Sequence, residues 1–246
     1  MTKRVLSSLV FAFALLASTA ALAEEGGTLD AAHTNIHDVA AMQRGARTFF
    51  NYCVGCHSLE YMRYSRIAQD LDLSESQVMT NLDMTGGKFG DPVISAMPTD
   101  EAAQWFGKAP PDLSLEVAAR GPDWVYTYLK SFYVDPTRPA GWNNTLFPNV
   151  SMPFPLWELQ GVQTAVYAPV AAGHTSRVER LTLSQPGAQT PEQYDRTVRD
   201  LTTFLQYVSE PAALQRERIG IWVLLYLAGF TFLAFLLKRE FWKDVH

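Results

Sequence analysis

The clearest pattern in the sequence is a pair of segments whose apolar residues recur at three- and four-residue intervals, as on one face of an α-helix. The first segment covers 38–52, with Asp38 as its expected N-cap, and its apolar positions are Val39, Met42, Ala46, Phe49 and Phe50. The second starts at Thr190-Pro191, with Gln193 completing a capping box, and its apolar positions are Tyr194, Val198, Leu201, Leu205 and Val208. We expect the two helices to pack across each other, and Gly45 permits a close crossing.

Outside these two segments, the sequence between residues 24 and 183 is less regular and predicts shorter elements. They are an extended arm over 24–37, a helix over 58–73, a short helix opened by a capping box at 74–77, a loop-rich stretch over 85–112, helices over 113–133 with a break at 120–123, irregular backbone over 134–173 and a short strand at 178–183. The predicted fold is therefore mainly α-helical, with long irregular loops.

A long apolar run lies at the start of the chain. It covers 5–22, follows Lys3 and Arg4, and ends with Ala21-Leu22-Ala23 before Glu24. A basic start, an apolar middle and an A-x-A exit are the parts of a secretory signal peptide. The alternative is an uncleaved membrane anchor, which the small residues at the exit disfavour. We predict a signal peptide over residues 1–23.

A second apolar run lies near the end of the chain and contains no charged residue over 219–237. At about 1.5 Å per residue, these 19 residues just span a hydrocarbon core. Lys238, Arg239 and Lys243 follow the run and favour a cytoplasmic C-terminus, although Arg216 and Arg218 weaken that signal. The predicted organisation is a body over 24–218, a transmembrane helix over 219–237 and a cytoplasmic tail over 238–246.

The charge of the predicted body is negative and uneven. Of the 25 acidic and 20 basic side chains in the chain, 23 and 15 lie in residues 24–218, which gives a net charge of about −8. Nine acids but only two bases, Lys88 and Lys108, lie between Asp70 and Glu116. Such a surface can attract a cationic partner or simply aid solubility. A negative body disfavours nucleic acid as a partner.

The chemistry of the chain centres on Cys53-Val54-Gly55-Cys56-His57. C-x-x-C-H is typical of c-type haem attachment, because thiols at i and i+3 share one face of a helical turn and can reach both vinyl groups. His57 follows directly and can bind the iron as the proximal ligand. A redox pair would need a βαβ context, and a zinc site would need more ligands, whereas Cys53 and Cys56 are the only cysteines.

The residues alone leave several candidates for the second axial ligand. Met152 is favoured because it lies on a stiff loop, between Val150-Ser151 and Pro153-Phe154-Pro155, and a methionine ligand raises the haem potential. Met97 and Met84 are rival ligands, and a histidine or an open site remains as an alternative. His33 and His37 have no neighbouring ligand at metal spacing, so we interpret both as ordinary solvated or core histidines.

Two further features are candidates for the haem environment. Pro110 and Pro111 stiffen an extended segment that could form a wall, and its carbonyl groups could accept the other imidazole N–H of the haem histidine. Arg120 carries a planar guanidinium suited to a propionate. On the residues alone, the proline pair is equally consistent with a simple loop and Arg120 with a surface arginine.

The motifs together resemble the cytochrome c1 family. They are Arg44-Gly45 before the C-x-x-C-H motif, Ala109-Pro110-Pro111-Asp112-Leu113-Ser114, Ala119-Arg120-Gly121, Phe147-Pro148 before Met152-Pro153, and one C-terminal span. The resemblance covers nearly the whole mature chain. It implies that Cys53 and Cys56 carry one covalently attached haem c, with His57 and Met152 as axial ligands.

The resemblance also implies roles for the wall of the site. Arg120 would meet a propionate, and Pro110 and Pro111 would line the haem. The stretch from Arg120 to Trp124 is shorter than the mitochondrial pattern, and Trp124 stands where a tyrosine is usual. Whether Trp124 or Tyr126 contacts a propionate is therefore open.

The function implied by the resemblance is electron transfer in quinol:cytochrome c oxidoreductase. Electrons would pass from a Rieske iron–sulfur protein, through this chain, to a soluble or tethered cytochrome c, and cytochrome b would pack against the anchor helix. The chain itself would be a carrier rather than a catalyst, in a bacterial inner membrane with its haem domain in the periplasm. The rival functions are the haem subunit of another respiratory oxidase or reductase, and a haem-based sensor with an open sixth site.

Overall fold

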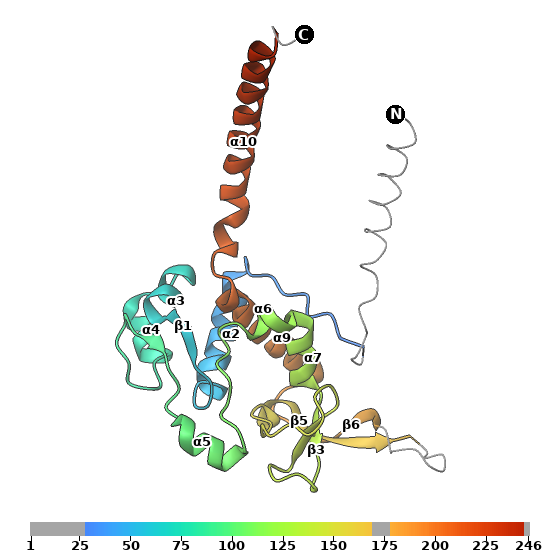
Figure 1. Cartoon of the computed structure of the whole chain (residues 1–246). Coiled ribbons are helices and arrows are strands. Elements are labelled where there is room, and N and C mark those ends of the chain that lie inside the picture. The colour runs from blue at the N-terminus through green and yellow to red at the C-terminus, as the bar shows by residue number, and fades with distance from the viewer. Residues whose placement is uncertain (1–27, 169–177, 244–246) are drawn as a thin grey trace, which may run out of the picture.

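Two long helices cross at the centre of the body, α2 and α9 (Figure 1). The computed structural model describes residues 28–168 and 178–243, so the predicted signal peptide over 1–23 lies outside the described residues. The elements are α2 Val39–Tyr52, β1 Leu59–Arg63, α3 Tyr64–Asp70, α4 Glu75–Asn81, β2 Pro92–Val93, α5 Thr99–Phe106, α6 Glu116–Arg120, α7 Pro122–Lys130, β3 Phe132–Val134, β4 Trp142–Asn144, α8 Trp157–Gln160, β5 Gly161–Tyr167, β6 Val178–Pro186, α9 Pro191–Ser209 and α10 Ala213–Phe241. The mainly α-helical prediction is confirmed.

The crossing of α2 and α9 confirms both helices predicted from the apolar periodicity. Asp38 accepts the Ala41 N–H as the N-cap of α2, and the capping box at Thr190 begins α9. Gly45 lies at the crossing, where a Cβ atom would be 2.1 Å from the carbonyl oxygen of Asp200. The backbones therefore approach as closely as they do because position 45 has no side chain.

Aromatic side chains fill the core beneath this crossing. Phe49 lies edge-on to Phe50 with ring centroids 5.4 Å apart, and it also contacts Phe204 at 5.9 Å. The ring of Tyr64 packs on Phe50 at 5.9 Å, which joins α3 to the same cluster. All four rings are buried. Burial of such rings is worth several kcal/mol in total. The cluster therefore holds α2 in place and sets the position of its C-terminal end.

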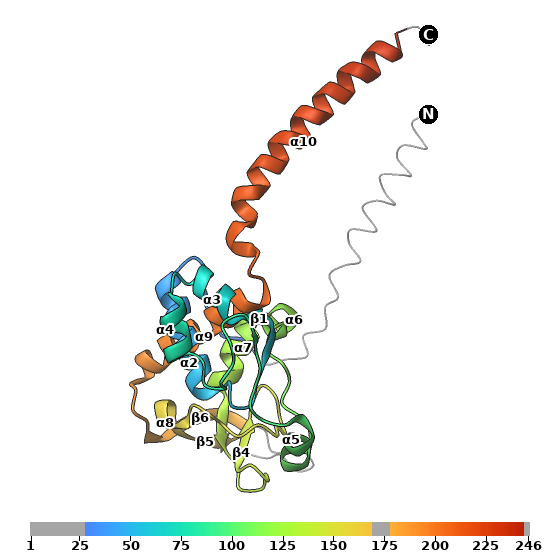
Figure 2. The same ribbon diagram turned by 90° about the vertical axis from the view of Figure 1, so that its left-hand side faces the viewer.

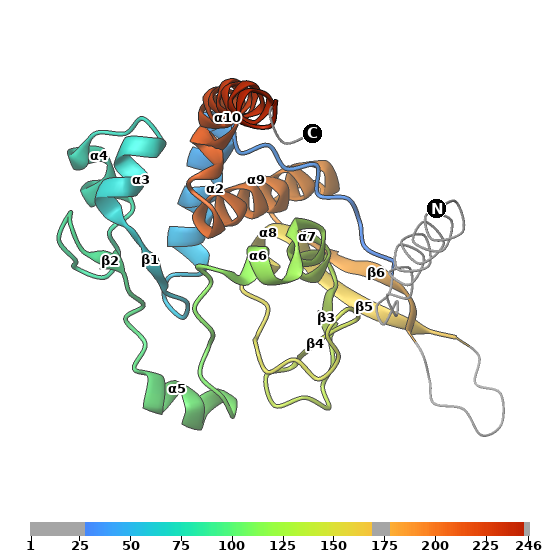
Figure 3. The same cartoon turned by 45° about the horizontal axis from the view of Figure 1, so that its top comes forward.

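Three two-stranded antiparallel sheets border the helices: β1–β2, β3–β4 and β5–β6. The β5–β6 ribbon and the α3–α4 region lie on opposite sides of the α2–α9 pair (Figure 3). The predicted strand at 178–183 is confirmed as part of β6, which extends to Pro186. Its partner β5 lies in the stretch 134–173 that we expected to be irregular, so that expectation is wrong in part.

The expected helix over 58–73 is wrong in its first part, which forms strand β1. The burial of Leu59 and Met62 has the three-residue spacing of a helix. However, the backbone is held in place by side chains from a distant loop: Asp112 accepts the Glu60 N–H and Ser114 accepts the Tyr61 N–H. These long-range bonds outweigh the local pattern, and only α3 remains helical.

Helix α10 projects from one end of the body (Figures 1 and 2). Within its segment Arg218–Phe241, the most apolar 18-residue window has a mean hydropathy of 2.2 and is not buried by the body, so the helix is long and apolar enough to cross a membrane. The expected linker over 212–218 is mostly helical, because α10 begins at Ala213.

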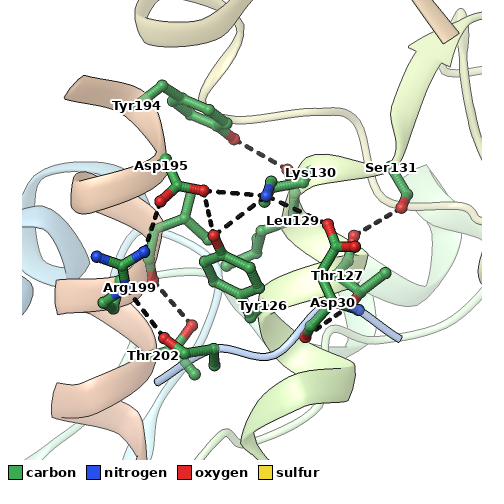
Figure 4. A network of polar contacts seen from close by, with 12 residues as sticks. Asp30, Tyr126, Thr127, Leu129, Lys130, Ser131, Tyr194, Asp195, Arg199 and Thr202 are labelled. Carbon is green, nitrogen blue, oxygen red and sulfur yellow. Dashed lines mark hydrogen bonds and ion pairs between the residues drawn. The ribbon is translucent and has the colours of Figure 1, made fainter. Parts of the chain in front are cut away.

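The described part of the N-terminal arm, residues 28–37, has no helix or strand, as predicted, and is fastened to α7 and α9 (Figure 4). The Asp30 N–H donates to Thr127, and the buried Ala32 exchanges bonds with Asp123 and Arg199. Lys130 donates to Asp30 at 3.2 Å and to Asp195 at 3.0 Å. This network ties α7, which borders the functional site, to the central helix α9.

Candidate haem-attachment site

The Cys53–His57 motif forms a tight turn at the end of α2. Cys53 is the C-cap of that helix, and its carbonyl oxygen accepts the N–H groups of Cys56 at 3.0 Å and His57 at 2.9 Å. Ser95 braces the turn from outside, since its hydroxyl donates to the Gly55 carbonyl at 2.9 Å. The turn places Cys53, Cys56 and His57 together on the wall of one pocket.

The His57 imidazole is held by the proline segment, as its sequence suggested. Its Nδ1 lies 2.8 Å from the Pro111 carbonyl oxygen. Since a carbonyl only accepts, Nδ1 carries the proton and Nε2 keeps a free lone pair. Burial lowers the pKa of His57, against the opposing effect of the Pro111 hydrogen bond. The ring is therefore neutral and ready to bind a metal through Nε2.

The two thiols are free in the sense that neither forms a disulfide. Burial, with a smaller contribution from Cys56, raises the pKa of Cys53 to about 12, and burial also raises the pKa of Cys56. Both thiols are therefore protonated at neutral pH. Because the thiolate and not the thiol binds metals, the raised pKa values disfavour metal–thiolate chemistry at this site.

Met152 lies on the wall of the same pocket. Its neighbours Val150 and Phe154 are buried on either side, and the Phe154 ring stacks on Phe132 with centroids 4.8 Å apart. The Met152 thioether accepts a hydrogen bond from the Tyr128 hydroxyl at 3.4 Å. The loop is thus anchored at both sides of Met152, and the structure brings together the thiols, the imidazole and the thioether.

The other candidate ligands lie elsewhere. Neither Met84 nor Met97 lines this pocket, as far as the described residues show, and Met84 is 51% exposed. His33 and His37 are exposed on the N-terminal arm. Among the described residues there is also no group of three His, Cys, Asp or Glu side chains that could hold a metal ion. The geometry therefore favours Met152 over the rival ligands.

Two asparagines that the sequence analysis did not single out shape the methionine loop. Asn144 accepts the N–H groups of Leu146 and Phe147, and its amide donates to the Tyr128 carbonyl at 2.8 Å. Asn143 accepts the Asn149 N–H at 2.9 Å. Asn-Asn in a Pro-rich stretch signals a turn, but nothing local shows which backbone groups the side chains bind.

Arg120 lies at the edge of the pocket, where its guanidinium stacks 4.3 Å above the Trp124 ring and forms an ion pair with Glu116. Gly121, with φ of 86°, separates α6 from α7 and confirms the predicted break. Trp124 lines the pocket, whereas the buried Tyr126 donates its hydroxyl to Asp195 on the opposite side. The structure therefore places Trp124, and not Tyr126, beside Arg120.

The remaining wall is mostly apolar. Pro110 and Pro111 line it as expected. Further apolar side chains that the sequence analysis did not assign to the site come from helices α6, α7 and α9 and from neighbouring loops: Leu113, Val117, Val125, Leu129, Val150, Leu201 and Leu205. An apolar pocket with two thiols and an imidazole on one helical turn and a thioether on a separate loop fits a covalently attached haem.

The acidic segment between Asp70 and Glu116 has local structural roles. Asp70 pairs with Arg66, accepts the Tyr207 hydroxyl at 2.8 Å and is only 7% exposed. Asp83 accepts three consecutive backbone N–H groups, over 85–87. Asp112 holds β1, as described above. Because these carboxylates stabilise the fold, changing Asp70 would not be a clean test of a docking surface.

Comparisons with known proteins cover nearly the whole chain. The Cytochrome C1 family matches residues 30–245. A cytochrome c1 from Allochromatium vinosum is 52% identical over 95% of this chain and 97% of its own length. A protein from Nitrosomonas europaea named ammonia monooxygenase gamma subunit is 41% identical over 99% of this chain and 100% of its own length. A protein from Bradyrhizobium diazoefficiens named cytochrome b/c1 is 27% identical over 85% of this chain and 34% of its own length.

Proposed function

The chain belongs to the cytochrome c1 family, whose members bind one covalently attached haem c, and we propose that it is the membrane-anchored electron carrier of a quinol:cytochrome c oxidoreductase. The observation that carries this proposal is the meeting of two thiols, a neutral imidazole and a thioether on one apolar pocket. The bound haem supplies one-electron redox chemistry. Since His57 and Met152, from two separate segments, would both bind the iron, no substrate would need to bind it.

Each residue of the proposed site has a distinct task. Cys53 and Cys56 would hold the haem through two thioether bonds, formed when each S–H adds to a vinyl group. His57 would bind the iron through Nε2, and the Pro111 carbonyl fixes the tautomer and orientation of its ring. Met152 would bind the iron through its sulfur. Arg120, already stacked on Trp124, would meet a propionate with its planar guanidinium.

The partners are cytochrome b, a Rieske iron–sulfur protein as electron donor, and a soluble or tethered cytochrome c as acceptor. The Bradyrhizobium relative is about three times as long as the segment that it shares with this chain, and its name pairs cytochrome b with c1. This supports a complex of the chain with cytochrome b. The Rieske protein as electron donor and cytochrome c as electron acceptor are what the family resemblance implies.

The body lies in the periplasm and α10 crosses the inner membrane with the C-terminus in the cytoplasm. Lys238 and Arg239 occupy the last turn of α10, and cationic residues beyond a span favour the cytoplasmic side. At the end of α10 that adjoins the body, Arg216 forms an ion pair with Glu210. This pair neutralises part of the positive charge that would favour the opposite orientation. The segment over 1–23 is the export signal that places the body outside.

Purification of the full chain from membranes in mild detergent tests this function. The proposal requires cytochrome b and a Rieske protein in the same complex, together with a haem spectrum from this chain. Co-purification with subunits of another oxidase or reductase, or with monooxygenase subunits as the name of the Nitrosomonas relative suggests, would assign the chain to that complex instead.

Replacing Met152 with leucine should remove the methionine–iron charge-transfer band of the oxidised protein and lower the midpoint potential by on the order of 100 mV, because a thioether ligand favours the reduced iron. Leucine is close in volume, so the apolar wall is preserved. Visible spectroscopy and redox titration measure both effects.

The matched control is Met97→Leu, since Met97 also precedes a proline but does not line the pocket. We expect this variant to keep the band and the potential of the unmodified protein. A Met152→Leu protein with an unchanged band would show that another residue, or none, is the second ligand, and would revive the sensor with an open sixth site.

A further inference from the structure

The side chain of Tyr128 is the only hydroxyl group recorded against the Met152 sulfur among the described residues, with the oxygen 3.4 Å from Sδ. Its ring is clamped between two other aromatic rings. The Trp124 ring stacks on one face with centroids 5.0 Å apart and an interplanar angle of 11°, and Phe132 meets it edge-on at 5.0 Å. The phenol therefore has little freedom to point elsewhere.

The backbone of Tyr128 holds the methionine loop as well. Its carbonyl oxygen accepts the Asn144 amide at 2.8 Å, and Asn144 in turn binds the N–H groups that start the loop. The same residue thus contacts the loop at its start and the thioether at its centre. This arrangement sets the position of Met152 relative to helix α7.

The Tyr128 hydroxyl acts as a donor in this contact. A thioether sulfur carries no hydrogen and can only accept, so the phenol supplies the proton of this contact. Within the described parts of the chain, the thioether is the only acceptor recorded for it. A buried hydroxyl without an acceptor is costly, which gives the O–H group a reason to stay on the sulfur.

We propose that Tyr128 is a positioning residue for the distal ligand, whose hydroxyl donates to one lone pair of Met152 Sδ and leaves the other lone pair for the iron. This inference rests on the proposed function. The hydrogen bond withdraws electron density from the sulfur and so makes it a weaker donor to the oxidised iron. It therefore raises the midpoint potential and restricts the rotation of the thioether.

The test is Tyr128→Phe in the full-length haem protein, because phenylalanine keeps the stacked ring and removes only the hydroxyl. Loss of a typical hydrogen bond corresponds to about a fivefold change in an equilibrium constant. For a one-electron couple this lowers the midpoint potential by about 40 mV. The methionine–iron band should persist but change its wavelength, since Met152 still binds while its sulfur becomes a stronger donor.

Tyr126→Phe is the matched control, since it removes the same atom two residues away on α7. That hydroxyl donates to Asp195 and does not face the pocket, so the potential and the band should stay unchanged. If Tyr128→Phe loses its haem, 3-fluorotyrosine incorporated at position 128 replaces it as the probe. This stronger donor should raise the potential.

The outcomes distinguish a failure of the proposed Tyr128 role from a failure of the proposed function. An unchanged potential and an unchanged band in Tyr128→Phe, or in the fluorotyrosine protein, would overturn the role of Tyr128 and leave the proposed function intact. An equal shift in Tyr126→Phe would also overturn it, because the effect would then not depend on contact with the sulfur. Unmodified protein without covalent haem or without the band would instead overturn the proposed function.

Discussion

Replacing both Cys53 and Cys56 with alanine should yield mature protein that carries no covalently bound haem. Thioether bonds need a sulfur on the protein, and the chain contains no other cysteine that could substitute. The loss should be complete rather than partial. It is measured by the intact mass of the mature chain and by haem staining after denaturation, which detects only covalently bound haem.

The single variants should give intermediate results. With one cysteine left, one thioether can form, so the haem should remain attached with one unreacted vinyl group and an absorption band moved to longer wavelength. Gly55→Ala is the control within the same motif, because a Cβ atom at position 55 has no neighbour within 4 Å. It should retain the haem, and its intact mass should exceed that of the unmodified haem protein only by the CH2 group of the substitution. A double variant with haem still bound after denaturation would contradict the covalent site.

The attachment motif could be predicted from the sequence because its chemistry is local. Two vinyl groups and one iron atom dictate the spacing of Cys53, Cys56 and His57, and five consecutive residues contain it all. The sequence could also predict that His57 donates to a carbonyl group of the proline segment, since a proline pair leaves its carbonyl groups without helical partners. That Pro111 is the acceptor required the structure.

The methionine side of the site could not be derived in the same way. Met152 was one of several methionines on loops, and the loop position depends on Asn143 and Asn144, which bind backbone groups up to sixteen residues away. The role of Tyr128 depends on the same loop. Contacts of this kind have no sequence period, so spacing alone cannot reveal them.

The fold shows the same division between local and distant causes. Helices α2 and α9 were predictable because their apolar stripes and caps lie within the segments themselves. Strand β1 was not, because the groups that hold it come from Asp112 and Ser114, about fifty residues later. Strand β5 was not predictable for the same reason, since it is held by pairing with β6, in which Pro186 lies opposite Gly161.

Replacing Gly45 with alanine should destabilise the body strongly, although alanine is the better helix former. The gain in helix propensity is at most about 1 kcal/mol. Against it, the new methyl group would lie 2.1 Å from the Asp200 carbonyl oxygen and 2.7 Å from the Phe204 Cβ. Backbone atoms cannot rotate away, so α2 and α9 must separate, at a cost of about 3 kcal/mol or more. We expect a net loss of about 2 kcal/mol or more in the free energy of unfolding.

Urea unfolding of the haem protein, followed by circular dichroism, measures this loss, with Gly90→Ala as the control. Position 90 has open space around a new Cβ atom, so the control should unfold at the same urea concentration as the unmodified protein. Separation of the helices should also reach the haem, because α9 contributes Leu201 and Leu205 to the pocket wall. The methionine–iron band should therefore disappear at a lower urea concentration in Gly45→Ala than in the control. A Gly45→Ala protein as stable as the control would mean that the crossing of α2 and α9 is looser than the structure indicates, and that the wall of the haem site does not depend on it.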